Sequence, residues 1–343
     1  THIAWGITSG YGDVVDLYTE TEDPSIPGHY LEGEQSLPFS TREESLRIRD
    51  ADAPDGFRSQ TLLIRHTRRG PVITGHGITA TEHKQLSLRW AYAEFMGTAL
   101  GDYQLLQAKS VAQALPALHK MTMSTTYVIA DTKGNIARQA TGFIPRRLDG
   151  DGSAPYPVSS TADNWDGLLA GSDLPVVVNP GQGWVGSTNH RIVPDDYNWH
   201  FSTHFAHSWR YRRLTQLMES IKTWGLQDHL KGQLDIKNML ATMLAPVMAE
   251  ALLEHEPTQA LGELLNRWDH QDDKEASAPL IFQAVLLHYA RLVVEDNLGP
   301  ILTESYLNDA YYWHERLVHI TLNRDSQWLD DTRTEQHETR EDL

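Results

Sequence analysis

The side chains that could do chemistry in this sequence are histidines, carboxylates, hydroxyls and amides, because the chain contains no cysteine. A thiolate nucleophile, disulfides and cysteine-based metal sites are therefore excluded. The densest histidine group is His200, His204 and His207. On a helix, His200 and His204 would face the same side and could bind zinc. No Glu lies between them as a metalloprotease would require, and the stretch is rich in aromatic residues, so we expect a loop.

Oxygen and amide groups occur at two further places. Asp13 and Asp16 lie in a predicted turn, and hard oxygen ligands of this kind suit Ca²⁺. Acidic residues in turns are otherwise usually just solvated. Asn189 closes the predicted strand at 184–188, where an Asn is ordinarily a turn residue. The residues alone therefore favour neither a metal site nor a catalytic amide.

Charge and composition limit the partners. The chain has 343 residues with 29 Lys and Arg against 46 Asp and Glu, a formal net charge of -17. No basic block could neutralise phosphates, which excludes nucleic acid. Hydrophobic residues make up 40%, as in globular proteins, and no apolar run approaches the roughly 20 residues that span a bilayer. We therefore expect no nucleic-acid partner and no membrane partner.

The elements that must position these groups show two different hydrophobic patterns, one in each part of the chain. Residues 1–212 predict a mainly antiparallel, sheet-rich part, and residues 213–343 predict a mainly helical part, so the fold class is α+β. The expected strands cover residues 3–7, 60–65, 70–73, 125–130, 135–142 and 184–187, with a hairpin turn at 131–135. The expected helices cover residues 110–121, 214–221, 236–247, 259–268 and 278–295. Pro246 is expected to kink or split its helix, and the polar tail 323–343 to be solvated or frayed.

Several stretches in order resemble the penicillin acylase family, which includes acyl-homoserine-lactone and cephalosporin acylases. They are HIAWGITSGYGDVVDLY at 2–18, GPVI at 70–73, LSLRW at 86–90, ADTKGNI at 130–136, NWDG at 164–167, NP at 179–180, GWVGSTN at 183–189, RL at 213–214 and WD at 268–269. The resemblance implies an incomplete αββα N-terminal-nucleophile hydrolase fold. It also implies an internal piece of the β subunit, truncated at its C-terminal end.

In that family the nucleophile is an N-terminal Ser whose own α-amine serves as the general base. The resemblance places this Ser upstream of Thr1, so we expect the chain alone to be inactive. Thr1 could itself be an N-terminal nucleophile, but it falls where the family has an ordinary residue. The α subunit and the remaining β-subunit segments are implied partners, and their absence predicts an exposed apolar surface and self-association.

The resemblance also implies roles for individual residues. Asn189 matches the side chain that stabilises the oxyanion, and Ser9 matches the residue whose backbone N–H does so. Arg213 matches an Arg that orients the catalytic Asn and the nucleophile's amine; the alternative is a surface cation in the run Arg210, Arg212 and Arg213.

Two binding sites complete the implied set. Ile7, Trp90 and Thr125 match the acyl pocket, where Thr125 replaces a larger apolar residue; the alternative for Ile7 and Trp90 is a plain core role. Asp13, Val15 and Asp16 match a structural calcium site, in which His200 stands near the position of a further carboxylate.

The expected function is therefore hydrolysis of N-acyl amides of the penicillin or acyl-homoserine-lactone type, in the periplasm or outside the cell. Two alternatives stay open: a non-catalytic binding or scaffold module on the same fold, and a zinc protein built on His200 and His204. Asn189, Ser9 and Arg213 together favour the enzyme, because a scaffold needs no oxyanion-binding residues.

Overall fold

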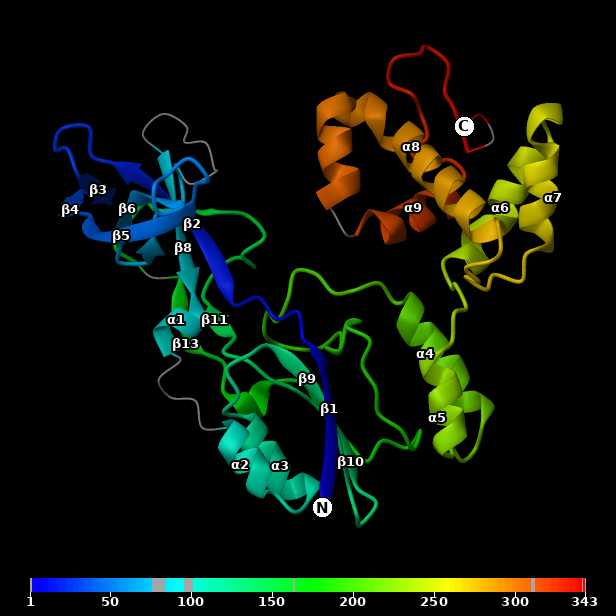
Figure 1. Ribbon diagram of the computed structural model, residues 1–343, viewed down its shortest axis with the longest axis horizontal. Helices are drawn as coiled ribbons and strands as arrows, with labels where there is room; N and C mark the ends of the chain where they lie inside the picture. The colour runs from blue at the N-terminus through cyan, green and yellow to red at the C-terminus, as the bar shows by residue number, and fades with distance from the viewer. Residues whose placement is uncertain are drawn as a thin grey trace. The chain divides into compact units, whose positions relative to one another are not determined.

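The computed structural model describes residues 2–75, 84–95, 101–162, 164–309, 312–340 and 342. The chain forms two compact units, Thr1–Phe205 and Ala206–Leu343, each with a hydrophobic core of its own (Figure 1). The first unit contains the strands and the second is helical, as predicted. The division falls after Phe205, whereas the sequence pattern placed it after residue 212.

A four-stranded antiparallel sheet contains Ser9, Ile7 and Thr125. Its strands, in spatial order, are β1 (Ile3–Ser9), β9 (Thr125–Asp131), β10 (Ile136–Ala140) and β14 (Val176–Val178). Helices α2 (Gly101–Gln107) and α3 (Val111–Leu118) pack their apolar side chains against β1, β9 and β10. β1 is an edge strand of this sheet, which leaves one side of its backbone unpaired within the sheet.

The hairpin between β9 and β10 forms where the sequence predicts it. Asp131 Oδ1 accepts hydrogen bonds from the N–H groups of Lys133 and Asn135, at 2.9 and 3.0 Å, and Gly134 has φ of 87°. Asp131 Oδ2 accepts the N–H of Val111 at 3.1 Å, where α3 begins. Burial by itself raises the pKa of Asp131, but the bonds from Val111 and Asn135 outweigh it and hold the pKa at about 2.

Helix α3 also begins as predicted. The Oγ of Ser110 accepts the N–H of Gln113 at 3.3 Å, which satisfies one of the unpaired donors at a helix start. Val111, Ala114 and Leu118 are buried on its inner face. The apolar spacing in the sequence therefore identified the face that packs on the sheet.

A second sheet has buried charges at its centre. Its strands are β12 (Tyr156–Pro157), β2 (Val15–Glu22), β3 (His29–Glu32) and β4 (Gln35–Pro38), and β8 (Lys84–Trp90), followed by α1 (Ala91–Phe95), also pairs with β2. Arg69 Nη1 lies 3.4 Å from Glu20 and 2.6 Å from Glu32, and all three side chains are buried. Buried charges persist only when they are paired in this way.

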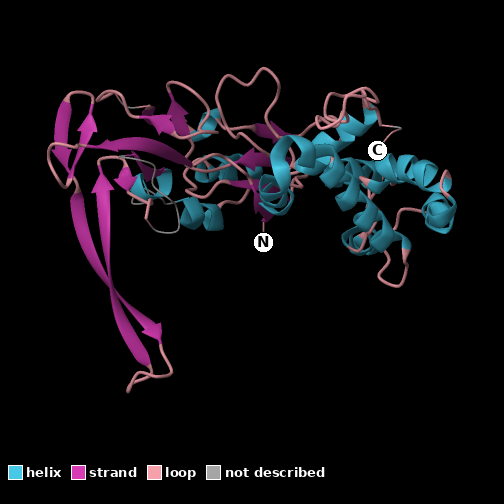
Figure 2. Cartoon of the chain, turned by 90° about the horizontal axis from the view of Figure 1, so that it is seen from above, coloured by secondary structure: helices cyan, strands magenta, loops and turns pink. Residues whose placement is uncertain are grey.

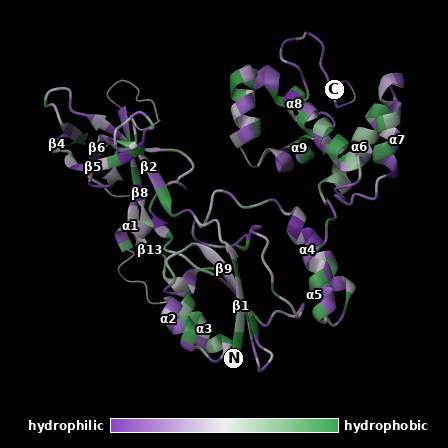
Figure 3. Cartoon of the chain, in the orientation of Figure 1, coloured by the Kyte–Doolittle hydropathy of each residue, from purple (hydrophilic) through white to green (hydrophobic). Residues whose placement is uncertain are grey.

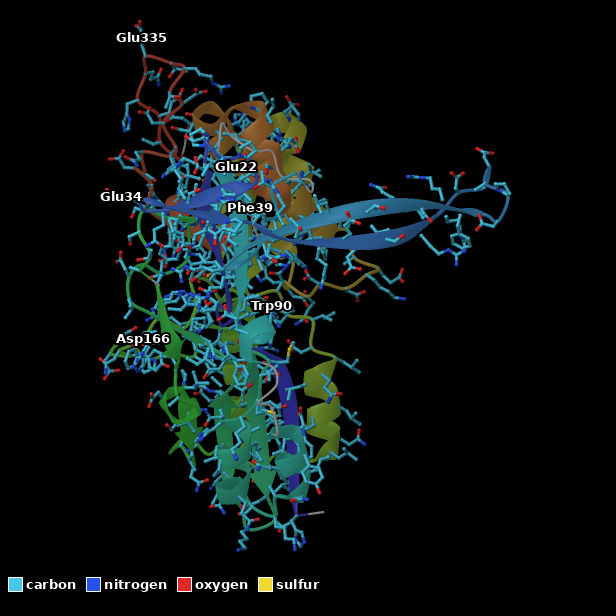
Figure 4. All side chains as sticks on the ribbon, turned by 90° about the vertical axis from the view of Figure 1, so that its left-hand side faces the viewer. Glu22, Glu34, Phe39, Trp90, Asp166 and Glu335 are labelled. Carbon is cyan, nitrogen blue, oxygen red and sulfur yellow. The ribbon has the colours of Figure 1, made fainter. Side chains whose placement is uncertain are left out.

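A third sheet forms a long ribbon that extends away from the rest of the first unit (Figure 2). It contains β5 (Ser40–Arg49), β6 (Phe57–Thr67) and β7 (Gly70–Pro71). The ribbon begins directly after Phe39, labelled in Figure 4. β6 confirms the strand predicted at 60–65, and β7 is shorter than the strand predicted at 70–73.

The strand predicted at 184–187 is wrong. No regular secondary structure is assigned to these residues. They follow β14 in the chain. Before β14 come the paired strands β11 (Pro145–Arg147) and β13 (Trp165–Leu168) and the single turn η2 (Gly171–Asp173). Gly186 interrupts the apolar run, and Gly183, directly before it, has φ of 77°, which a strand does not allow.

The second unit is a group of helices around one core. They are α4 (Trp209–Ser220), α5 (Leu226–Gln233), α6 (Ala241–Leu253), the single turn η3 (Glu256–Thr258), α7 (Gln259–Arg267), α8 (Ala278–Asp309) and α9 (Trp313–Leu322). Buried side chains of α6, α7, α8 and α9 form the core. Figure 3 shows the apolar character of α6 in green.

Two features of α6 differ from the prediction. Ile236 and Met239 precede the helix, whose first N–H, that of Ala241, donates to the side-chain oxygen of Asn238 at 2.9 Å. Pro246 lies inside α6 and does not split it.

Helix α8 is longer than predicted. It continues beyond residue 295 to Asp309, with a break at Gly299, whose φ and ψ are 69° and 166°. Phe282 and Leu286 are buried in the core, whereas Leu280 is 74% exposed. The segment Ala278–Asn308 is long and apolar enough to cross a membrane by length and composition alone, but its buried face makes it a core helix of this unit.

The polar tail is not simply frayed. Its described part contains no helix or strand after α9, yet Leu329 is buried in the core of the second unit. Leu329 and polar contacts such as the hydrogen bond from the Thr332 N–H to Asp296 Oδ2, at 2.9 Å, attach the tail to the helices.

Candidate active site

The last residue of β1, Ser9, directs its backbone away from the neighbouring strand. The N–H of Gly10 donates to Ser124 O at 3.0 Å, and the N–H of Thr132 donates to His2 O, also at 3.0 Å. In an antiparallel pair the hydrogen-bonded positions alternate, so Ser9, opposite Thr125, occupies a position that is not bonded to β9. Both its N–H and its C=O therefore point to the free edge of β1.

Asn189 lies at this same edge. Its side-chain Nδ2 donates to the carbonyl oxygen of Ser9 at 2.8 Å, across 180 residues of sequence. Its backbone N–H donates to Ser187 Oγ at 3.3 Å, and that hydroxyl also accepts from Thr8 Oγ1 at 3.1 Å. The structure thus brings together Ser9 and Asn189, two residues that the resemblance assigned to one site.

Glycines set the path of the chain after Ser9. The Oγ of Ser124 accepts the N–H of Gly12 at 2.7 Å. A Cβ on Gly12 would lie 2.7 Å from this Oγ and 2.4 Å from Ile144 Cδ1, so no larger residue fits without a shift. Gly142 packs on Ser124 from another side with φ of 125°, a conformation that favours glycine. Close packing on Ser124 therefore fixes the turn that begins at Ser9.

The three predicted acyl-pocket residues lie on connected elements. Ile7 and Thr125 share one face of the β1–β9 pair with Ser9, and Ile7 is 59% exposed. Trp90 ends β8, is 42% exposed and packs against Tyr92 with ring centroids 5.5 Å apart (Figure 4). The hydroxyl of Tyr92 accepts the N–H of Ser124, the residue before Thr125.

Arg213 lies in the second unit, in α4. Its Nε and Nη2 donate to the two carboxylate oxygens of Asp235, at 2.8 and 2.6 Å. This bidentate pair raises the pKa of Arg213 and lowers the pKa of Asp235. The role of Arg213 in orienting Asn189 stays a prediction.

Two of the three residues predicted to bind calcium, Asp13 and Asp16, already have nitrogen donors against their side-chain oxygens. Asp16 is buried and accepts from Arg147 Nη2 at 2.9 Å and from Trp165 Nε1 at 2.5 Å. Asp13 Oδ2 lies 2.8 Å from His200 Nε2. Val15 is the first residue of β2, opposite Trp90.

The histidines do not form the helical pair that zinc would need. Residues 200–207 form an irregular segment, as the aromatic content predicted. His200 contacts Asp13, and His204 lies edge-on to Tyr11 and contacts Thr203. Within the described part of the chain, no three His, Asp or Glu side chains are grouped to hold a metal ion.

Comparison with known proteins decides the family. The family model described as penicillin amidase matches residues 1–343. The chain belongs to the penicillin amidase family. It is 29% identical to the acyl-homoserine lactone acylase QuiP of Pseudomonas aeruginosa, over 98% of this chain and 42% of that protein. It is 27% identical to penicillin G acylase of Escherichia coli, over 78% of this chain and 31% of that protein.

A solved penicillin amidase structure confirms the fold. The thermostable penicillin G acylase of Alcaligenes faecalis superposes with a TM-score of 0.70 over 89% of this chain and 55% of that chain, at 21% identity. The N-terminal-nucleophile hydrolase fold predicted from the resemblance is therefore correct. The chain spans less than half the length of the two curated relatives. Membership of the penicillin amidase family supports an amide-hydrolase function.

Two charged partners in this penicillin amidase homologue were not predicted. Arg147 lies 131 residues from Asp16, and Asp235 lies in a region predicted only as the approach to a helix. Neither has a local pattern that marks it. The only sequence signal was the surplus of carboxylates, each of which needs a donor when it is buried.

Proposed function

We propose that this chain is part of an amidohydrolase that cleaves N-acyl amides through an acyl-enzyme. The acyl group would be carried by an N-terminal Ser outside these 343 residues. The observation that carries the proposal is the meeting of Ser9 and Asn189 at the free edge of β1, with Asn189 Nδ2 2.8 Å from Ser9 O. Two donors at one edge suit the oxygen of an amide carbonyl under attack.

The proposed chemistry assigns a separate task to each donor. When the nucleophile adds to the amide carbonyl, the carbonyl oxygen becomes negatively charged and needs donors already in position. Asn189 Nδ2 carries two hydrogens in one plane, and the bond to Ser9 O fixes that plane. The N–H of Ser9 points to the same edge and would supply the second donor. For Arg213, the resemblance alone supports the proposed role of orienting the catalytic Asn and the nucleophile's amine.

The acyl group would contact Ile7, Trp90 and Thr125. Ile7 and Trp90 present partly exposed apolar surface, which an acyl chain or ring could cover. Thr125 bonds to Thr141, with the two hydroxyl oxygens 2.7 Å apart, and adds a polar group to this wall. The names of the two relatives, an acyl-homoserine lactone acylase and a penicillin G acylase, give the class of substrate that we propose: small N-acyl amides.

Mass spectrometry of the longest natural precursor, expressed with its upstream region, tests this function. We expect cleavage directly before a Ser upstream of Thr1, and acylation of that Ser by a slow chromogenic N-acyl amide. The 343-residue chain by itself should show no turnover. Single-turnover acylation of Thr1 would contradict the assignment of the nucleophile. An uncleaved, inactive precursor would instead indicate a fold kept for binding.

A further inference from the structure

Arg147 lies among the oxygen atoms that the family resemblance assigns to calcium. Its Nε is 3.2 Å from Asp16 Oδ1 and 3.0 Å from Oδ2, and its Nη2 is 2.9 Å from Oδ1. The same Nη2 donates to the main-chain oxygen of Asp13 at 3.0 Å. One guanidinium therefore contacts the carboxylate of Asp16 and the main-chain oxygen of Asp13, two residues of the predicted calcium site.

The pair is fully enclosed. The side chains of Arg147 and Asp16 are 1% and 0% exposed. Arg147 Nη1 is buried with no hydrogen-bond partner among the described residues. The hydrogen bonds of the guanidinium are therefore those of Nε and Nη2. A Cβ on Gly152 would lie 2.3 Å from Asp16 Oδ1, so the backbone of Gly152 packs closely against the carboxylate.

The hydrogen-bond acceptor positions of the Asp16 carboxylate are all occupied. A carboxylate can accept about four hydrogen bonds. Arg147 contributes two contacts to Oδ1 and one to Oδ2, and Trp165 Nε1 contributes the fourth. Asp13 Oδ2 accepts from the backbone N–H of Thr203 at 2.6 Å and also contacts His200. Ca²⁺ needs about six to eight oxygen ligands, and a guanidinium in contact with two of them repels it.

We infer that Arg147 takes the place of the metal ion, so that this chain holds residues 13–16 with an internal cation and binds no calcium there. The guanidinium joins β11 to the start of β2, just as a bridging ion would. His200 makes the corresponding contact with Asp13 from residues 198–203, near the position where the family has a further carboxylate.

Calcium binding by the purified 343-residue chain tests the inference. After treatment with EGTA, we expect no calcium above background in elemental analysis, no heat of binding when CaCl₂ is titrated, and the same Tm in EGTA as in millimolar CaCl₂. Uptake of one calcium ion per chain, with a Tm that rises on binding, would overturn the inference. This measurement needs no catalytic activity, so its failure is distinct from failure of the proposed function.

Two variants test whether the positive charge of Arg147, and not only its packing, takes the place of calcium. Arg147→Ala leaves the Asp16 carboxylate unpaired in a buried place, so the Tm should fall by roughly 10 °C, and millimolar CaCl₂ should restore part of this loss. Arg147→Lys keeps a cation and should lose less, with no response to calcium. Arg146→Ala is the matched control, because Arg146 is 42% exposed and pairs with Asp166 at the surface. Equal calcium responses of Arg147→Ala and Arg146→Ala would contradict the inference. If Arg147→Ala does not fold, calcium binding by Arg147→Lys and by the unmodified chain still tests it.

Discussion

At the scale of single residues, Asn189 has a backbone conformation that few side chains adopt. Its φ is 67°, and Asn tolerates this left-handed region better than most residues. The turn directs its amide to the carbonyl oxygen of Ser9. A residue that the sequence alone would describe as a turn Asn can therefore also be a positioned hydrogen-bond donor.

Ser9 should act through its main chain only. In the processed natural enzyme, Ser9→Ala keeps the N–H and should leave kcat nearly unchanged. Ser9→Pro removes the N–H, and the free edge of β1 tolerates proline, so kcat should fall by about 10²–10³-fold. Steady-state kinetics on a chromogenic N-acyl amide measures both variants. Full activity of Ser9→Pro would remove this N–H from the proposed mechanism.

The motif match predicted Ser9 and Asn189 as residues of one site, but the sequence alone could not predict that the two are in contact. The two residues are 180 positions apart, and the segment between them includes β8, β9, β10 and a long irregular stretch. The same applies to Arg147, whose contact with Asp16 depends on how β11 lies beside β2. Only local chemistry, such as the Ser110 cap, was visible in the order of residues.

At the scale of elements, Asp131 joins the β9–β10 hairpin to the start of α3. In the unmodified chain, backbone N–H groups donate to both carboxylate oxygens of Asp131. In Asp131→Asn, the amide nitrogen would face one of these N–H groups, so we expect lower stability at neutral pH. The folded pKa of about 2 lies below the ordinary value of 3.8. The stabilisation by ionised Asp131 is therefore complete above pH 3.8 and is lost as the pH falls toward 2.

Urea unfolding across this pH range checks the prediction. The difference in stability between the unmodified chain and Asp131→Asn should shrink as the pH falls from above 3.8 toward 2. Asp166→Asn is a suitable control, because that carboxylate is exposed and bonds to Arg146 at the surface. A difference that does not change with pH would show that Asp131 does not act through its charge.

Elements with strong periodicity were predicted, and those that depend on tertiary pairing were not. The hairpin at 131–135 and helices α3, α4 and α7 follow from turn chemistry and apolar spacing. Only β6 of the β5–β6 ribbon was predicted, because β5 is largely exposed and most of its residues are polar or charged. The apolar run at 184–187 failed as a strand because Gly186 interrupts it and Gly183, directly before it, has φ of 77°.

At the scale of the whole molecule, each unit leaves apolar side chains exposed. In the first unit, Trp5 and Ile7 are 42% and 59% exposed on β1, the edge strand of its sheet. An exposed apolar edge strand favours pairing with another chain. The exposed edge of β1 therefore supports the expectation of self-association, which stays a prediction.

Analytical ultracentrifugation over a range of protein concentrations tests this point. We expect the unmodified chain to associate as the concentration rises, and Ile7→Lys to associate less, because a charge on the edge opposes strand pairing. Ile26→Lys is the control, since Ile26 is also exposed but lies in a turn before β3. A monomer at every concentration would contradict the expectation.

The turnover of Asn189→Ala in the processed natural enzyme tests the central claim most directly. If Asn189 stabilises the oxyanion, kcat for a chromogenic N-acyl amide should fall by about 10²–10³-fold. Asn179→Ala controls for the backbone, because Asn179 has a comparable φ of 47° and its side chain bonds to Asn135 at the β10–β14 end of the sheet. Equal turnover by the two variants would mean that Asn189 is only a turn residue, and the proposed oxyanion site would have to be given up.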